Sequence, residues 1–146
     1  MRCIIPLLLF FYCCTSNEKE FVDMLSTNNP RTNGFLLQGS DALKQHNFIE
    51  ALSFADSASK YATQKADIHF FKGRVYSELG RFKEAEQAYM KALKATPSYR
   101  GIWNNLGNNA YRQQNFSQAI DYYMQEVAQN KASIPLRAVG RAFVEL

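Results

Sequence analysis

The sequence predicts an all-α protein built from stacked helical hairpins, and three observations lead to that fold class. Identical residues recur at a fixed interval of 34 positions, and apolar residues inside each interval recur at helical spacing. The length of 146 residues, with 47% apolar and 21% charged residues, is that of one packed domain. The formal net charge of +4 favours acidic partners without being a nucleic-acid signature.

The first 14 residues, MRCIIPLLLFFYCC, have the pattern of a targeting segment. Arg2 precedes the apolar run Ile4–Tyr12, which is shorter than the roughly 20 residues that a membrane-spanning helix needs. A charged start followed by a short apolar run is typical of a secretory signal peptide. We therefore exclude residues 1–14 from the predicted fold.

All three cysteines, Cys3, Cys13 and Cys14, lie in this segment, so residues 15–146 have no thiol chemistry. An apolar run that ends in Cys before the polar stretch 15–20 resembles a bacterial lipoprotein signal. The resemblance implies cleavage before Cys14 or Cys13, and a lipid on that sulfur that anchors the protein in the cell envelope, facing the periplasm or the exterior. The alternatives are a plain cleaved signal, giving a secreted or periplasmic protein, and an uncleaved anchor or a misassigned start of the chain.

Residues 15–31 predict a tether between this segment and the repeats. The stretch is polar and ends in the loop-forming run Ser26–Pro30. Residues 18–25 are long enough for one or two helical turns, and their apolar side chains are candidates to dock on the first repeat.

Three units follow, at 32–65, 66–99 and 100–133. They are defined by three sets of identical residues at intervals of 34: Gly39, Gly73 and Gly107; Phe48, Phe82 and Phe116; Ala51, Ala85 and Ala119. No gap is needed to align them, so we expect three copies of one structural unit.

The apolar pattern of each unit predicts two helices joined by a short turn. In the second copy the first apolar stripe, Ile68 to Leu79, ends at Gly80, and a second stripe from Phe82 to Leu93 is followed by Pro97. Asn47 and Asn115 lie at or next to the equivalent turns, and Asn tolerates the left-handed conformation common at helix ends.

The repeated glycines predict close packing inside each hairpin. A glycine within a helix costs about 1 kcal/mol relative to alanine, so three in one register need a compensating cause. We expect the repeated aromatic rings to press against the backbone there, with the repeated alanines allowing the two helices to approach closely.

The second and third copies carry the residues by which the chain resembles the tetratricopeptide repeat (TPR): Gly73, Tyr76, Gly80, Phe82, Ala85, Tyr89, Ala92, Pro97, Trp103, Leu106, Gly107, Phe116, Ala119 and Tyr123. The resemblance implies a right-handed α-solenoid whose first helices line a concave groove. The first copy departs most, with Gln38, Ala55 and Thr63 in place of apolar, aromatic and Pro residues. Residues 134–146 predict either a capping helix or the start of a truncated fourth unit.

The sequence offers no constellation for catalysis, metal binding or cofactor binding. His46 and His69 are the only histidines and are not paired, and no Gly-rich phosphate loop or nucleophile elbow is present. His69 aligns with Phe35 and Trp103, which indicates a packing role. Most aromatic residues occupy packing positions, so base stacking on nucleic acid is not expected. We therefore predict a non-enzymatic protein without cofactors.

The resemblance implies that one side of each first helix faces a ligand. The groove candidates are Asn33, Leu36, Ser40 and Leu43 from the first copy, Asp67, Phe70, Arg74 and Ser77 from the second, and Asn104, Asn108, Tyr111 and Arg112 from the third. Asn amides both donate and accept hydrogen bonds, and arginines bind carboxylates, so a peptide or protein partner is expected. The alternative is a structural subunit of a larger envelope assembly that uses its convex face or the ends of the array.

Overall fold

The computed structural model describes residues 29–130 and residue 144, and six helices make up almost all of this part of the chain. The helices are α2 (Pro30–Lys44), α3 (Phe48–Ser59), α4 (Lys65–Glu78), α5 (Phe82–Ala95), α6 (Ile102–Arg112) and α7 (Phe116–Asn130). No strand occurs among the described residues, which confirms the all-α prediction. The predicted signal segment, nearly all of the tether and nearly all of the C-terminal segment lie outside the described residues.

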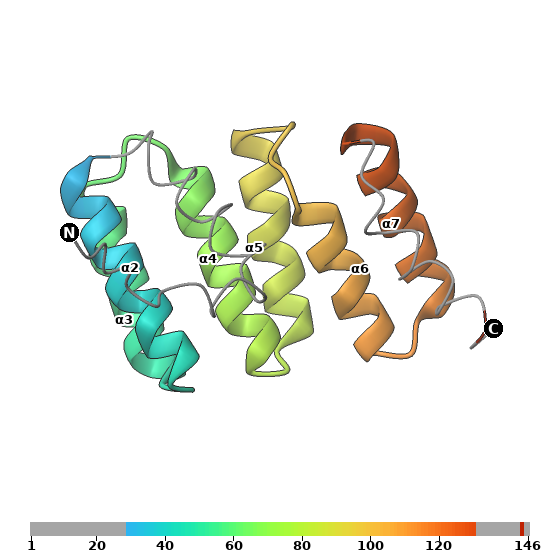
Figure 1. Cartoon of the computed structure of the whole chain (residues 1–146), viewed down its shortest axis with the longest axis horizontal. Coiled ribbons are helices and arrows are strands. Elements are labelled where there is room, and N and C mark those ends of the chain that lie inside the picture. The colour runs from blue at the N-terminus through green and yellow to red at the C-terminus, as the bar shows by residue number, and fades with distance from the viewer. Residues whose placement is uncertain (1–28, 131–143, 145–146) are drawn as a thin grey trace, which may run out of the picture.

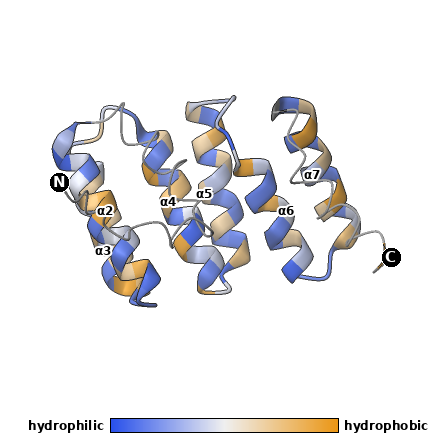
Figure 2. Ribbon diagram, in the orientation of Figure 1, coloured by the Kyte–Doolittle hydropathy of each residue, from blue (hydrophilic) through white to orange (hydrophobic). Residues whose placement is uncertain are grey.

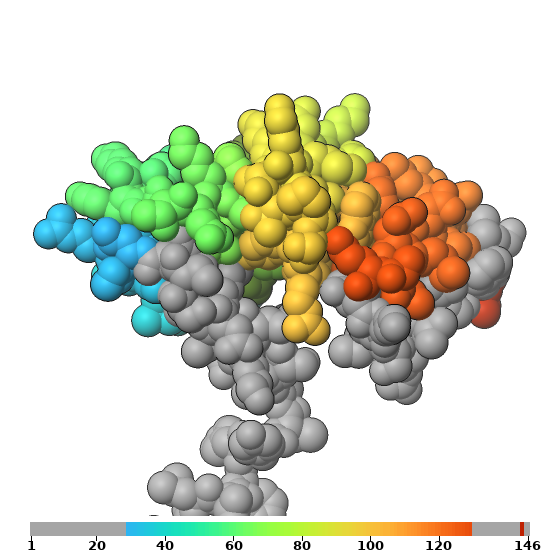
Figure 3. Space-filling view, turned by 90° about the horizontal axis from the view of Figure 1, so that it is seen from above, coloured from blue at the N-terminus to red at the C-terminus, as the bar shows by residue number. Residues whose placement is uncertain are grey.

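The helices form three antiparallel hairpins, α2–α3, α4–α5 and α6–α7, which stand side by side in chain order (Figure 1). The same order is visible from above, where the colours run from blue to red along one row (Figure 3). Further contacts join α2 to α4 and α4 to α6, so the first helices of successive hairpins adjoin one another. We call the surface formed by α2, α4 and α6 the inner surface, and that formed by α3, α5 and α7 the outer surface.

Helix α2 begins inside the stretch that the sequence analysis assigned to the tether. Pro30 occupies the first turn, where the missing N–H of proline costs nothing, and the Asn29 side chain accepts a hydrogen bond from the Arg31 N–H at 2.9 Å. This capped start places the first hairpin two residues earlier than the predicted unit boundary at residue 32.

The turn inside each hairpin repeats with the same 34-residue period as the sequence. The residue two positions after the first helix is left-handed in every copy, with φ of 59° at His46, 73° at Gly80 and 60° at Gln114. The following N–H bonds a carbonyl five residues back, from Asn47 to Ala42, from Arg81 to Tyr76 and from Asn115 to Ala110. This is the Schellman arrangement of a helix end. The left-handed residue therefore precedes Asn47 and Asn115, which instead begin the second helices.

The repeated glycines pack against aromatic rings, and in the second and third copies the ring belongs to the same hairpin, as predicted. A Cβ on Gly73 would lie 2.5 Å from the Tyr89 ring, and one on Gly107 would come equally close to the Tyr123 ring. In the first copy Ala55 replaces this tyrosine, and Gly39 instead meets the Phe71 ring of the next hairpin, at 2.9 Å from the Cβ position. Every copy thus uses the absence of a side chain to let a ring touch the helix backbone.

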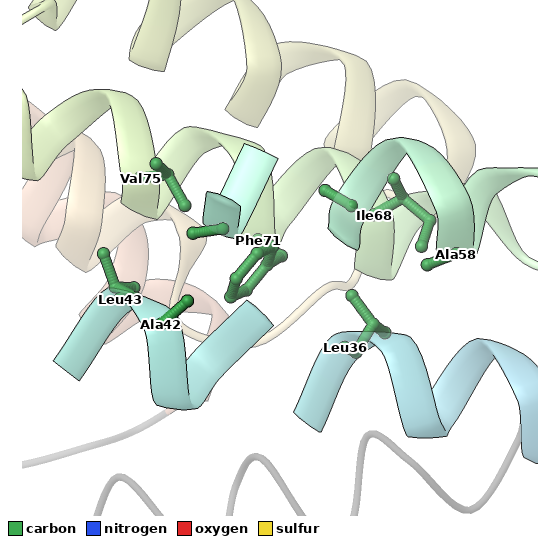
Figure 4. Packing of buried hydrophobic residues seen from close by; sticks show 9 residues of the cluster. Leu36, Ala42, Leu43, Ala58, Ile68, Phe71 and Val75 are labelled. Carbon is green, nitrogen blue, oxygen red and sulfur yellow. The ribbon is translucent and has the colours of Figure 1, made fainter. Parts of the chain in front are cut away.

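Amphipathic helices bury their apolar stripes between the hairpins, and every helix carries hydrophilic as well as hydrophobic residues (Figure 2). In the first core cluster, Phe71 and Val75 of α4 lie against Leu36 and Leu43 of α2 (Figure 4). Leu36 is 0% exposed, so it belongs to this core and does not face a ligand. The resemblance placed it in the groove, but its side chain turns toward α3 and α4 and is covered by them.

Replacing Gly73 by alanine is expected to lower the free energy of unfolding by about 1–2 kcal/mol, because overpacking against Tyr89 outweighs the gain in helix propensity. The matched control is Gly34→Ala in α2, where a Cβ meets nothing within 4 Å, and a gain of up to about 1 kcal/mol is expected. Urea unfolding followed by circular dichroism measures both. Equal effects in the two variants would contradict the packing model.

The left-handed turn residues give a second prediction. His46→Gly and Gln114→Gly should each stabilise the protein by about 0.5–1 kcal/mol, since glycine avoids the strain of a positive φ. Gly80→Ala at the equivalent position should destabilise it by about 1 kcal/mol. Thermal unfolding midpoints of the three variants provide the measurement, and a lower midpoint for His46→Gly would show that its side chain makes a compensating contact.

Candidate functional site

A pocket of about 310 Å³ opens on the inner surface between α4 and α6. Its wall is formed by residues of both helices and one residue of α7: Ser77, Glu78, Asn105, Asn108, Tyr111, Arg112 and Tyr123. These side chains offer donors, acceptors, one positive and one negative charge, and aromatic surface. The pocket is therefore suited to polar ligands with hydrogen-bonding groups of both kinds.

Arg112 spans the pocket from α6 to α4. Its Nη1 donates to the Ser77 carbonyl oxygen at 2.9 Å, and its guanidinium lies 5.0 Å from the centre of the Phe82 ring. A guanidinium has five N–H donors in a fixed plane, so this contact orients the group while leaving further donors toward solvent. Arg112 is thus a positioned cation at the mouth of the pocket.

A buried hydrogen bond ties the same two helices together beneath the pocket. The Ser77 hydroxyl donates to the Asn109 side-chain oxygen at 2.5 Å, and both residues are buried. Because polar groups removed from water need partners, this bond fixes the lateral register of α4 against α6. The pocket wall is therefore held by side-chain bonds as well as by apolar packing.

Glu126 of α7 holds the start of α6. Its carboxylate accepts hydrogen bonds from the backbone N–H groups of Gly101 and Asn104, each at 3.3 Å, and the residue is buried. The first N–H groups of a helix have no partners within the helix, and a negative charge is favourable there. The bond fixes the N-terminal end of the helix that contributes most of the pocket.

The side chain of Tyr123 connects the hairpin packing to the pocket. Its ring lies against Gly107, and its hydroxyl donates to the Asn108 side-chain oxygen at 2.8 Å. Asn108 is exposed, so this bond fixes the orientation of its amide and leaves the amide N–H groups toward the pocket.

The structure brings together four of the groove residues that the resemblance implied. Asn108, Tyr111 and Arg112 line the pocket together with Ser77. Arg74 is half-buried on α4, one turn before Ser77. Whether a ligand contacts these residues stays a prediction, because no structural observation of this chain tests it.

The other candidates have internal roles. Ser40 is buried, and Leu43 is buried in the first core cluster. Asp67 is also buried, and it accepts a hydrogen bond from the Tyr99 hydroxyl at 2.7 Å. Phe70 packs against the rings of Tyr89 and Tyr99, with ring centres 5.9 and 5.1 Å apart. Asn33 and Asn104 are half-buried, and the backbone N–H of Asn104 is bound by Glu126 as described above.

Three pocket residues were not among the candidates, namely Glu78, Asn105 and Tyr123. Glu78 lies 34 positions before Arg112, so the alignment of the repeats could have identified Glu78 as a further groove candidate. Tyr123 was assigned to packing because its ring recurs with Tyr89. Its hydroxyl reaches the pocket only through the tertiary arrangement of α6 and α7.

No group of three or more potential metal ligands occurs among residues 29–130. None of the helices in that range is long and apolar enough to cross a membrane. His69 is half-buried, and its pKa lies below the ordinary value because of burial first and the nearby Lys91, Lys72 and Lys65 second. The three lysines therefore give the second hairpin a positive electrostatic potential around His69, away from the pocket.

The tetratricopeptide-repeat family model matches residues 66–99, the second of the three hairpins. No curated protein matches the chain in sequence.

Solved structures with the same fold include three TPR domains. The Sgt2 domain from Aspergillus fumigatus has 16% identity and a TM-score of 0.71, and the match covers 81% of this chain and 80% of that one. The first TPR domain of Spaghetti (RPAP3), bound to the HSP90 peptide SRMEEVD, has 14% identity and a TM-score of 0.70, covering 80% and 95%. The TPR2B domain in a pHsp70 complex of yeast Sti1 has 13% identity and a TM-score of 0.67, covering 80% and 96%. At these identities the likeness establishes the fold.

Proposed function

We propose that this protein, which has the tetratricopeptide-repeat fold, is a non-enzymatic adaptor that binds a peptide or protein partner on its inner surface. The observation that carries the proposal is the polar pocket between α4 and α6, on the face where the first helices adjoin. Support comes from similar folds whose structures include peptide segments, as in the RPAP3 domain with an HSP90 peptide and the Sti1 complex with pHsp70.

The chemistry of the pocket suits an extended peptide. A peptide backbone presents alternating N–H donors and C=O acceptors. The side-chain amides of Asn105 and Asn108 contain both a hydrogen-bond donor and an acceptor. Arg112 and Glu78 add one charge of each sign, which sets the direction and register of a charged ligand. The half-buried Tyr111 ring adds rigid apolar surface at low entropic cost.

The alternative is a structural subunit that contacts its neighbours through the outer surface. A shallow hollow on α5 supports it, formed by Lys83, Glu86, Gln87, Met90 and Lys91. Met90 is 38% exposed there, so the hollow offers apolar surface between charged and polar side chains. The pocket lies on the inner surface and the hollow on the outer surface. An experiment that locates the bound partner therefore distinguishes the two functions.

The cellular site in this proposal is the cell envelope, with the protein held at a membrane by a lipid on Cys14 or Cys13. Support for this part is the pattern of residues 1–14, in which an apolar run ends in two cysteines. A lipid contributes about 0.8 kcal/mol for each buried methylene, so two or more chains hold a protein stably. An adaptor anchored in this way would recruit its partner to the membrane surface.

Site-specific photo-crosslinking tests which surface binds. A photoreactive amino acid replaces either Glu78 in the pocket or Met90 in the outer hollow; both are exposed. We expect one partner to be captured from Glu78 and not from Met90, and to bind the unmodified chain after purification. Capture from Met90 alone would reject the inner surface and favour the structural alternative.

Metabolic labelling with a fatty-acid analogue tests the anchor. The wild-type chain, expressed in a bacterium that processes lipoproteins, should carry the label and sediment with membranes. The Cys13→Ser, Cys14→Ser double variant should lose both properties, whereas Cys3→Ser should keep them. An unlabelled wild-type protein that is cleaved and released would instead establish a plain signal peptide.

A further inference from the structure

The two edges of the array, where the helices begin and end, differ in charge. Every first helix begins and every second helix ends at the upper edge of Figure 1, whereas the turns within the hairpins lie at the lower edge. We call the upper one the entry edge, because the chain enters the fold there at Pro30, and the lower one the turn edge. Figure 3 looks down onto the entry edge. The exposed cations at the entry edge are Arg31, Lys60, Lys65, Lys94 and Arg100.

Acidic side chains near the entry edge are already bonded inside the fold. Asp67 accepts a bond from the Tyr99 hydroxyl, and Glu126 accepts backbone N–H groups at the start of α6; both residues are buried. Asp56, one turn before the end of α3, accepts a bond from the Lys72 ammonium at 2.5 Å. The other described acidic residues lie in the half of their helices next to the turn edge. The five entry-edge cations form no ion pair within the described part of the chain.

Helix stability does not account for the position of these cations. The first turn of a helix carries a partial positive charge, so acidic side chains are favourable there and cations are unfavourable. Arg31 and Lys65 nevertheless lie in the first turns of α2 and α4, and Arg100 directly precedes the N-cap of α6. Only Lys60 and Lys94, at the ends of α3 and α5, suit the helix dipole. Three of the five cations therefore need a cause outside their own helices.

The spacing of the cations fits an extended anionic surface. Arg31 lies at the start of the first hairpin, Lys60 and Lys65 flank the connection to the second, and Lys94 and Arg100 flank the connection to the third. A small anion would contact only one of these places, whereas a layer of anionic headgroups would meet all of them. Each lysine or arginine close to an anionic bilayer strengthens binding about fivefold, and its long side chain reaches the headgroups.

We propose that the entry edge lies against an anionic lipid bilayer, with its lysines and arginines among the headgroups. The bilayer is favoured over an acidic protein by the path of the chain, because the segment with Cys13 and Cys14 joins the fold at this edge. This choice of occupant rests on the anchor proposed above. The helices then stand on the membrane, and the pocket between α4 and α6 lies near the turn edge, away from the lipid, because Ser77 and Arg112 come at the ends of their helices.

Vesicle binding tests the charge pattern separately from the anchor. The full chain with Cys13→Ser and Cys14→Ser has no lipid acceptor in the proposed signal, and residues 1–14 are otherwise the same in every sample. It is sedimented with vesicles of phosphatidylcholine, either pure or with about 30% phosphatidylglycerol. We expect at least tenfold stronger binding to the anionic vesicles at low salt, and loss of this difference at high salt. Equal binding to the two kinds of vesicle would overturn the proposal.

Two double variants in this chain compare the edges at equal net charge. Lys65→Gln with Lys94→Gln changes the entry edge, and Lys44→Gln with Lys83→Gln changes the turn edge; all four residues are exposed. The first pair should weaken binding to anionic vesicles at least tenfold, and the second should change it less than twofold. Equal losses would show that only net charge matters and would reject the entry edge. Thermal unfolding verifies that the variants are folded.

Single fluorescent labels test the orientation directly, because residues 15–146 contain no cysteine. With the three native cysteines replaced by serine, a dye on Ser98→Cys marks the entry edge and a dye on Gln45→Cys marks the turn edge; both residues are exposed. Lipids with a quencher on the headgroup should quench the dye at residue 98 and not the dye at residue 45. Quenching at residue 45 alone, or at neither residue, would reject the orientation.

The outcomes for the anchor and for the entry edge are distinguishable. If metabolic labelling finds no lipid but the vesicle and quenching results hold, the entry edge stands and the proposed anchor is wrong. If the chain is lipidated but binds both kinds of vesicle equally, the anchor stands and the entry edge is rejected. Capture of an acidic protein by a photoreactive group at Ser98, without preference for anionic vesicles, would replace the bilayer by that protein.

Discussion

The structure depends on one contact, in which an aromatic ring lies directly on the backbone of a first helix where a glycine leaves room. In the second and third hairpins a tyrosine of the second helix makes this contact, at Gly73 and Gly107. Any Cβ at these positions would overlap the ring, so the distance between the two helices is set by the ring itself. With that distance fixed, the alanines of the second helices are buried between the helices, and the hairpins stack on one another.

The same contact also links the hairpin core to the inner surface. The Tyr123 ring packs on the backbone of α6, and the residue also lines the pocket between α4 and α6. The hydroxyl of Tyr123 meets Asn108 there, and that of Tyr89 meets no internal acceptor. Tyr123 is in this way both a packing residue of the third hairpin and part of the pocket wall. The helices that bear the pocket are held further by the bonds from Ser77 to Asn109 and from Arg112 to Ser77.

Positions that agree among the copies and positions that differ lie in different parts of the structure. The positions identical in all three copies build the hairpins: their alanines are fully buried, and their phenylalanines are half-buried. Positions that differ, such as Arg74 against Asn108 or Glu78 against Arg112, lie on the first helices and are exposed or half-buried. In the first copy a packing position also differs from the other two copies. Ala55 removes the tyrosine, and Phe71 of the next hairpin replaces it against Gly39.

The sequence alone determined the number of hairpins, the positions of their turns and the packing of Gly73 and Gly107 against rings of their own hairpins, because these features depend on local periodicity and on repeated spacing. That Gly39 meets Phe71 of the next hairpin was decided by the stacking of the hairpins. Tertiary structure decided which face of each first helix is covered. Leu36 and Asp67 lie at helical spacing from positions that face solvent, yet both side chains are buried. The angle between successive hairpins determines which side of each first helix the next hairpin covers. The left-handed turn residues His46 and Gln114 also differ chemically from Gly80. The backbone follows the same path in all three turns and imposes a positive φ on these residues. The conformational preferences of His and Gln do not predict that value.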